Sequence, residues 1–485
     1  MKQYWLAVLL VIVFGRVGAA QSVRTDTATL SLQEALTRAF TQSEEIRLAR
    51  NQVELADAEV SSVRAGALPQ INGNLGYTRT FESQFSGGDT FQIPDSLQFT
   101  PDSMASIQDR LRYLEQNADI AGLGGLGTLF GNLPFGQPNA YTASLSGSQL
   151  LFSGGRVGAA LRAARAFRES ARFQLQEQQA DVELSVRTAY YRALFSQELE
   201  RISAAAVEQA ERFLAQERLR EKSGAASELD VLRAEVALAN LRPQLVASRN
   251  SAEFATLELK RLINVPATQP LQLTTPLTAP TAEAMREVAD SMVNLEQRAA
   301  VQAAERNVRM REMGVKIARG SFLPDITFSA VYGRLGYPVD PFNWTGVTWR
   351  TDWSATIAMR IPIFDGLRRN AQLDQAQTNL SNSRLQLAQL RENVQVQYQQ
   401  AVGERRRAQE VITARQQTVA QAQRVYDLTV LRYDRGLATQ LEVSDARLAL
   451  LQARTNLAQA LSDFYVAEAT VVRALGGSAI TTGAR

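Results

Sequence analysis

Two kinds of hydrophobic periodicity alternate along the chain. Residues 30–66 carry apolar side chains at helical spacing, and this pattern stops at Leu68-Pro69 because the residue before a proline avoids the helical region. The period then becomes two, with apolar side chains at Ile71, Leu75, Tyr77 and Phe81 and mostly polar ones between them. The same alternation returns at 141–152. A helix and two strands, each strand with one apolar and one polar face, are therefore predicted.

A long helical hairpin is predicted after the second strand. A proline-free helical pattern begins after Gly154-Gly155 and continues to about residue 222, which is roughly 100 Å at the α-helical rise. Helices of that length without a membrane-grade apolar run are typical of coiled coils. Gly224 can take the left-handed conformation that ends a helix, and a second helical pattern follows it as far as Val265. The two helices are therefore expected to turn at Gly224.

The same order of elements occurs a second time. Leu323-Pro324 repeats Leu68-Pro69 at an offset of 255 residues, and Gly436 repeats Gly224 at an offset of 212 residues. Helices are predicted at about 282–320, 368–434 and 439–475, with two strands between the first and second of these. An internal duplication of this size indicates one architecture built from two copies.

The duplication divides the chain into predicted parts. Residues 1–20 have a basic start, an apolar run and small residues before Gln21, which is typical of a cleaved signal peptide, with a short membrane anchor as the alternative. The parts that follow are a first repeat at 21–265 with a long loop at 82–139, a linker at 266–281, a second repeat at 282–476 with a loop at 336–352, and a flexible tail at 477–485. Both loops join paired strands at the end opposite the helices, and we expect them to face the cell exterior.

The composition argues against enzyme and nucleic-acid hypotheses. The 485 residues include no histidine, the commonest general base and metal ligand. They include no cysteine either, so neither a disulfide framework nor a lipid-anchored N-terminal cysteine is expected. The formal net charge of +3 is small and gives no support to nucleic-acid binding. No catalytic residue, metal or cofactor is predicted.

The four predicted strands are the part of the chain suited to a membrane. No later segment reaches the roughly 20 apolar residues of a transmembrane helix, whereas two-faced strands of this length fit a transmembrane β-barrel. Four strands cannot close around a pore, and an open edge is not tolerated in lipid. The predicted fold class is therefore mostly α with transmembrane β. Three chains would form one 12-stranded barrel and a long α-helical barrel.

Each predicted turn is followed by the signature of a new helix. Ser227 and Thr439 lie three residues before Asp230 and Glu442, which is the spacing of a capping box. Asp445 lies three residues after Glu442 and so shares its helix face. The two acids of the second tip could serve only as a cap and a complement to the helix dipole. In a trimer they could instead meet around one axis and concentrate a negative potential in a narrow mouth.

The order and spacing of these motifs resemble the TolC-like outer-membrane efflux proteins of Gram-negative bacteria. The resemblance covers essentially the whole mature chain: a duplicated Leu-Pro before a strand, Phe-x-Gly before each long helix, and Gly-x-x-Thr-x-x-Glu at the second tip. It implies a homotrimer in contact with outer-membrane lipid, with a helical tunnel through the periplasm. It also implies a tip that opens when a periplasmic adaptor and an inner-membrane pump dock. The exported substrate is not implied, nor whether the pump serves efflux or protein secretion.

The resemblance also implies roles for residues at the tips. It assigns Glu442 and Asp445 to a constricting ring, with Asp230 from the first tip and Tyr433 just before the second turn. The hydroxyl of Tyr433 is expected to bond to a neighbouring group, for instance Asp230. Contact with the adaptor is expected at Gly224, Ala225, Ser227, Gly436, Leu437 and Thr439.

One position departs from the family pattern. The basic residue that well-known members place two after the turn glycine is Ala438 here. The lock that this residue makes between helices must therefore be made differently, and Arg432 and Arg435 are the nearby candidates.

A competing class is a non-conducting periplasmic coiled-coil adaptor or structural protein. Such adaptors also have helical hairpins, but we would expect one hairpin flanked by compact β domains. This chain instead shows two hairpins, each preceded by amphipathic strands. The tryptophans between the last two strands, Trp344, Trp349 and Trp353, fit either an aromatic belt at a membrane surface or a packed outer loop.

Overall fold

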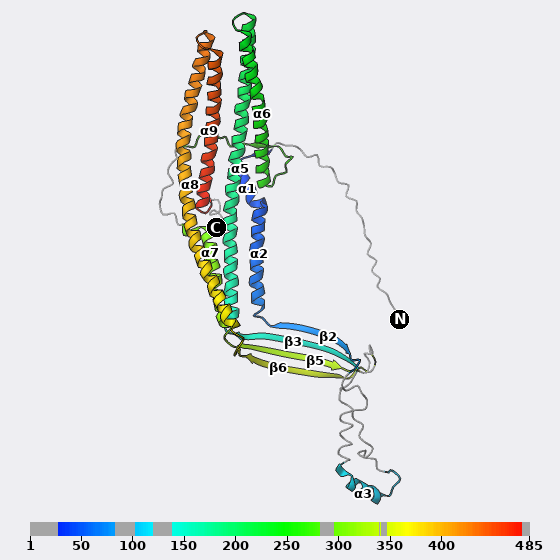
Figure 1. Cartoon of the computed structure of the whole chain (residues 1–485). Coiled ribbons are helices and arrows are strands. Elements are labelled where there is room, and N and C mark those ends of the chain that lie inside the picture. The colour runs from blue at the N-terminus through cyan, green and yellow to red at the C-terminus, as the bar shows by residue number, and fades with distance from the viewer. Residues whose placement is uncertain are drawn as a thin grey trace, which may run out of the picture. The chain divides into compact units, whose positions relative to one another are not determined.

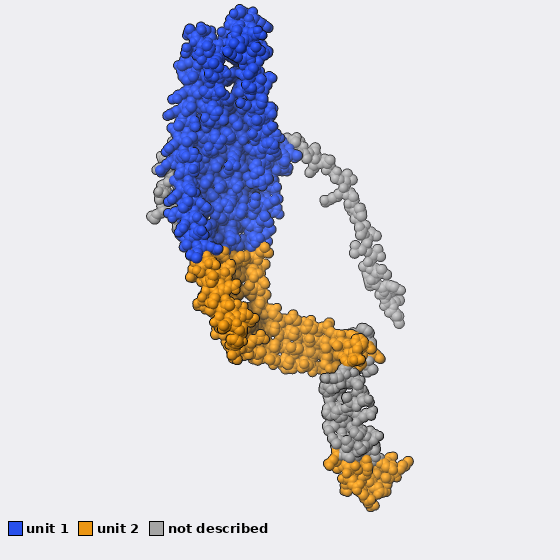
Figure 2. All heavy atoms as spheres, viewed as in Figure 1, with its two compact units in different colours: residues 1–54, 169–305, 385–485 blue, residues 55–168, 306–384 orange. Residues whose placement is uncertain are grey.

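The computed structural model forms two compact units, which are coloured separately in Figure 2. The residues described are 28–82, 102–119, 138–281, 295–338, 340 and 347–477. The helical unit comprises residues 1–54, 169–305 and 385–485, and the sheet unit comprises 55–168 and 306–384. The expected signal peptide, most of the loop 82–139 and the tail after Gly477 lie outside the described residues. Within the described ranges, no helix is both long and apolar enough to cross a membrane.

The predicted duplication is present in the helices, residue for residue. α5 (Arg156–Lys222) and α6 (Glu228–Leu262) contain 67 and 35 residues. α8 (Arg368–Asp434) and α9 (Gln440–Ala474) have the same two lengths and begin 212 residues later. We call α5 with α6 hairpin 1 and α8 with α9 hairpin 2; both are visible in Figure 1.

The helices before the strands repeat in the same way, with one correction. α2 (Glu44–Ala65) and α7 (Ala299–Gly320) both contain 22 residues, at an offset of 255. The single helix expected at 30–66 is wrong, because α1 (Leu32–Gln42) ends before α2 begins. Ser43 between them leaves the helical conformation, and its hydroxyl bonds to the Glu45 carboxylate at 2.6 Å. Serine competes for backbone and nearby side-chain partners in this way and often separates two helices.

The segment called a linker also contains structure. β1 (Ala28–Leu30) pairs in parallel with β4 (Leu271–Leu273), and the hydroxyl of the buried Tyr190 bonds to the carbonyl of Leu30 at 3.0 Å. The helix expected at about 282–320 is shorter in the described residues: α7 begins only at Ala299, after the short 3-10 helix η2 (Leu295–Gln297), and residues 282–294 lie outside the described ranges. The contacts of β1 and Tyr190 hold residues 28–30 and the linker against the helical core.

The four predicted strands form one antiparallel sheet. Its members, in spatial order, are β2 (Gln70–Arg79), β3 (Asn139–Ser153), β5 (Asp325–Gly336) and β6 (Trp349–Arg360). Every residue of the two edge strands, β2 and β6, is exposed. The first loop contains a further helix, α3 (Ile107–Gln116). Both edges of the sheet are unpaired in the described residues, so they remain available for other strands.

The hairpins lie side by side in the helical unit (Figure 1). α5 packs on α6 around Leu214 and Leu238, and α8 packs on α9 around Ile412 and Phe464. α5 also meets α9, since the ring of Tyr191 stacks on that of Tyr465 at 4.5 Å. The resulting order is α6, α5, α9, α8, which leaves one helix of each repeat on an outer side.

The candidate site at the hairpin tips

The two turns have the same backbone. Gly224 and Gly436 have φ of 74° and 73°, in the left-handed region that glycine adopts at low cost. The amides of the following residues, Ala225 and Leu437, bond to carbonyls five residues earlier at 2.7 and 2.8 Å. This pattern is a Schellman motif and satisfies carbonyls at the helix ends. The turns predicted from sequence are confirmed.

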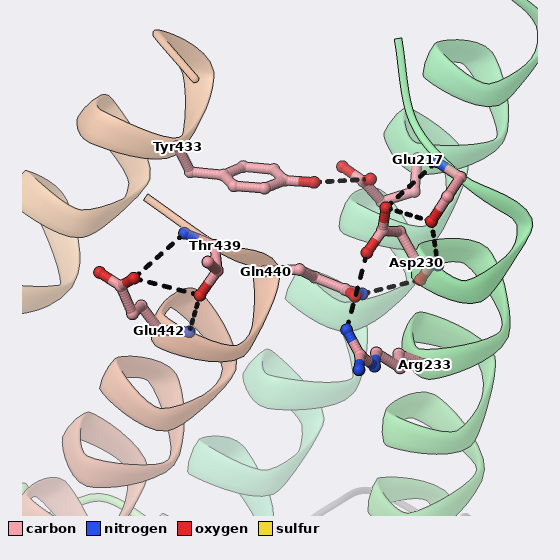
Figure 3. A network of polar contacts seen from close by, with 8 residues as sticks. Glu217, Asp230, Arg233, Tyr433, Thr439, Gln440 and Glu442 are labelled. Atoms are coloured by element: carbon pink, nitrogen blue, oxygen red, sulfur yellow. Dashed lines mark hydrogen bonds and ion pairs between the residues drawn. The ribbon is translucent and has the colours of Figure 1, made fainter. Parts of the chain in front are cut away.

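Both predicted capping boxes are present (Figure 3). The Ser227 hydroxyl donates to the Asp230 carboxylate at 2.6 Å and accepts the amide of Asp230 at 3.3 Å. These bonds from Ser227 hold the pKa of Asp230 below its ordinary value. The Thr439 hydroxyl likewise donates to Glu442 at 3.1 Å and accepts its amide at 3.3 Å. The capping interpretation of Glu442 is therefore confirmed.

The two acids expected in the ring and the residues expected to contact an adaptor are exposed to solvent. Glu442 and Asp445 are both exposed on α9, and within the described part of the chain Asp445 has no ion-pair partner. The six positions expected to contact an adaptor are also exposed: Gly224, Ala225, Ser227, Gly436, Leu437 and Thr439. Nothing in a single chain tests whether the two acids form a ring, so that role stays a prediction.

Tyr433 bonds across to hairpin 1, but not to the partner suggested from sequence. Its hydroxyl donates to the carboxylate of Glu217 on α5 at 2.7 Å, as Figure 3 shows, and not to Asp230. Glu217 is 0% exposed and Tyr433 is 8% exposed. Burial, followed by the bond to Glu217 and its charge, raises the pKa of the Tyr433 hydroxyl. The contact is therefore a buried, charge-assisted hydrogen bond between the hairpins.

Aromatic and cationic groups surround this bond. The guanidinium of Arg220 lies 4.6 Å from the centre of the Tyr433 ring, within the range of a cation–π contact. The Phe213 ring is 5.9 Å from the same ring and 5.7 Å from the guanidinium of Arg447. Burial lowers the pKa of Arg447. Tyr433 and Arg447 are thus both buried where the hairpins meet.

A second bond joins the first turns of α6 and α9. The side-chain amide of Gln440, which is buried, donates to the backbone carbonyl of Asp230 at 2.8 Å (Figure 3). Arg432, one candidate to replace the missing basic residue at Ala438, bonds instead to the carbonyl of Leu437 in its own turn at 3.1 Å. Among the described residues, neither Arg432 nor Arg435 bonds to hairpin 1, whereas Gln440 does.

The sequence contained a signal for Glu217 that our prediction missed. Val207, Ala210 and Leu214 are buried at alternating spacings of three and four, and Glu217 continues that series by three. An acid at a core position of a coiled coil requires a partner, because a buried unpaired charge is costly. Gln440 had no comparable signal, since its bond goes to a backbone carbonyl.

Comparison with known proteins gives a consistent family. A family model described as outer membrane efflux protein matches residues 125–265 and 293–477. The solvent efflux pump outer membrane protein SrpC of Pseudomonas putida is 24% identical over 260 residues, 53% of each chain. The cobalt-zinc-cadmium resistance protein CzcC of Cupriavidus metallidurans is 26% identical over 328 residues, 67% of this chain and 74% of its own. The chain thus spans about half the length of the solvent-pump relative.

Solved structures show the same fold. The outer membrane protein VceC of Vibrio cholerae matches with a TM-score of 0.71 at 20% identity, over 92% of this chain and 96% of its own. The open state of the MtrE outer membrane channel of Neisseria gonorrhoeae matches with a TM-score of 0.70 at 18% identity, over 92% and 89%. At these identities the likeness concerns the fold. A non-conducting adaptor, the alternative raised from sequence, has no support among these matches.

Proposed function

The chain belongs to the outer membrane efflux protein family, and from that premise we propose that it forms the exit duct of a tripartite efflux or secretion system. It resides in the outer membrane, where its relatives are placed. In the proposed role, a trimer accepts substrates from an inner-membrane transporter joined to it by a periplasmic adaptor. The helices line a tunnel through the periplasm, and the strands line the passage through the outer membrane.

The open edges of the chain carry this proposal. β2 and β6 are unpaired at the two edges of the sheet, and unpaired strand edges are not tolerated in lipid. The outer helices carry exposed apolar side chains as well, among them Leu232, Val236 and Phe254 on α6 and Val396, Val425 and Leu428 on α8. In both units one edge belongs to the first repeat and the other to the second. Contact between unlike edges of neighbouring copies is the kind of interface that closes into a ring.

The tip contacts support a gate. The bonds Tyr433–Glu217 and Gln440–Asp230 hold the start of α9 and the end of α8 against hairpin 1. Docking of an adaptor on the exposed turns would separate the hairpins and break both bonds. In the closed state, before docking, three copies each of Glu442 and Asp445 would define the narrowest, cation-selective ring.

Cargo selection is assigned to the inner-membrane partner in this proposal. The names of the relatives refer to solvents in one case and to cobalt, zinc and cadmium in another. Chemicals so different have no common binding chemistry, so the duct shared by such systems need not recognise them.

The assembly is tested by cross-linking in detergent. A three-subunit species is expected, because one chain supplies only four strands. A stable monomer that still conducts in planar bilayers would contradict the proposal.

The gate is tested by single-channel recording in planar bilayers. We expect Glu442→Ala with Asp445→Ala to weaken the preference for cations and the block by a trivalent cation, while the trimer still assembles. The control removes two exposed carboxylates from α8, Glu410→Ala with Asp427→Ala. It should keep both the cation preference and the block by a trivalent cation. If the tip variant behaved like the control, the two acids would act only at the start of α9 and the constriction would lie elsewhere.

A further inference from the structure

One face of the sheet is mostly apolar, and its charged residues lie at one end. Residues directly opposite one another in neighbouring strands point to the same face. The register therefore places on one face Ile71, Leu75 and Tyr77 of β2, Ile326, Phe328 and Tyr332 of β5, and Trp349, Trp353, Ile357 and Met359 of β6. Among the described strand residues of this face, two are charged, and both are arginines: Arg79 and Arg334.

Both arginines lie at the loop end of the sheet. Arg79 is the last residue of β2, and Arg334 lies two residues before the end of β5. At the helix end of the strands, the charged residues Asp325 and Arg360 point to the opposite, polar face. Asp325 is also bonded there to Arg156. The apolar face is thus charged at the loop end only, and only positively.

Aromatic side chains lie on the same face in the rows next to those of the two arginines. Tyr77 is directly opposite Tyr141, with ring centres 5.2 Å apart, and Tyr332 is directly opposite Trp353. A Cβ at Gly336 would lie 3.1 Å from the Trp349 ring, so the indole crosses the sheet over this glycine. Aromatic rings in this arrangement are typical of the level where lipid headgroups meet the hydrocarbon. The exposure of Trp353, 72%, favours the belt interpretation over a packed outer loop.

Neither arginine has an acidic partner among the described residues. The guanidinium of Arg79 lies 5.8 Å from the centre of the Phe81 ring. Arg334 is directly opposite Ala143 and Thr351. Both side chains are exposed, so their guanidinium groups are open to an anion from outside the chain.

We propose that Arg79 and Arg334 bind the phosphate groups of lipids in the outer leaflet of the outer membrane. The guanidinium fork matches phosphate oxygens in a bidentate manner and is weakly hydrated, which suits a site at the edge of a hydrocarbon layer. The rows of aromatic rings place these groups at headgroup depth, and the loop end is the end expected to face the exterior. The inference rests on the proposed membrane-spanning role of the sheet.

The test uses the purified trimer in detergent and diphosphorylated lipid A, a phosphate-bearing glycolipid, with bound lipid counted by native mass spectrometry. Arg79→Gln with Arg334→Gln should lower the apparent affinity about tenfold or more, because two charge-assisted contacts are lost. The control, Arg350→Gln with Arg360→Gln, removes two arginines from the polar face and should bind like the wild type. Dephosphorylated lipid A should bind the wild-type trimer as weakly as the diphosphorylated lipid binds the variant.

Three results would overturn the proposal: unchanged affinity in the first variant, an equal loss in the control, or equal binding of the dephosphorylated lipid. Inorganic phosphate at millimolar concentration should compete poorly. Full competition would show an anion site without preference for lipid and would be a fourth result against the proposal. Conductance and cross-linking of the same preparations keep the two proposals distinguishable. A conducting trimer that ignores lipid phosphate would sink this inference alone, whereas a wild-type protein that neither trimerises nor conducts would sink the proposed function.

Discussion

The two hairpins share a backbone and differ in the side chains that join their helices. In hairpin 1, three exposed ion pairs link α5 with α6: Arg218–Glu235 at 2.6 Å, Arg242–Glu211 at 3.1 Å and Arg249–Glu200 at 3.1 Å. The matching positions of hairpin 2, 212 residues later, hold Val430 and Arg447, Arg454 and Gln423, and Leu461 and Ile412. Of these pairs, Arg454–Gln423 keeps a hydrogen bond, at 2.6 Å.

The difference follows the surroundings of each hairpin. Ile412 is 0% exposed and belongs, with Leu461, to the core that α9 shares with α8. Its counterpart Glu200 keeps 32% of its side-chain surface exposed. Helix lengths and turns are the same, so the backbone of a hairpin does not depend on which pair joins its helices. At one of the three matched positions, the exposed ion pair Arg249–Glu200 of hairpin 1 corresponds to Leu461 and Ile412 in the buried core of hairpin 2.

The largest effect is expected for Ile412→Ala. It leaves a cavity in a fully buried site and should lower the free energy of unfolding by about 2–5 kcal/mol. Glu200→Ala at the matched position should cost only about 0.2–1 kcal/mol, because an exposed ion pair contributes little. Thermal unfolding in detergent, followed by circular dichroism at 222 nm, compares the two. Equal losses of unfolding free energy would mean that the helices of both hairpins are joined by the same kind of contact.

Tyr433→Phe should have the next largest effect and should act on the gate. It removes the hydrogen-bond donor of the buried Glu217 carboxylate. A hydrogen bond to a charged group stabilises a fold by about 1.5–3 kcal/mol, so a loss of that size is expected. The closed state should loosen, giving longer or larger openings in planar bilayers. Tyr426→Phe, two turns earlier on α8, removes a hydroxyl that forms no hydrogen bond among the described residues and serves as the control. Wild-type gating in Tyr433→Phe would show that the bond does not hold the tip closed.

Removing the caps should have a smaller effect than Tyr433→Phe, and the two tips should respond alike. Ser227→Ala and Thr439→Ala should each cost about 1 kcal/mol. Since the folded state depresses the pKa of Asp230, its contribution is present above the ordinary value of 3.8 and is lost as pH falls through the lower, folded value. The gap in stability between wild type and Ser227→Ala should therefore narrow on acidification. Ser223→Ala in the same turn is the control, and a gap that widened would contradict this assignment.

The sequence predicted the backbone of the tips better than the contacts between them. The turns at Gly224 and Gly436 and both capping boxes follow from local rules, since each involves residues within a few positions of one another. The partner of Tyr433 depends instead on how one hairpin is rotated against the other. Many exposed acids were available to this tyrosine, and only the core spacing of Glu217 distinguished it. The break at Ser43 was missed because helical periodicity continues on both of its sides.

Because α5 and α8 have equal lengths and face each other near their ends, the length of the hairpins can vary only by certain numbers of residues. Removing one residue from either helix would turn everything beyond it by about 100°, and Tyr433 would no longer face Glu217. Seven residues, about 10 Å of helix, nearly restore the facing, but all four helices of the two hairpins must then grow together for the turns to end level. A relative adapted to a different distance between membranes should therefore have whole heptads added to, or removed from, each of the four helices.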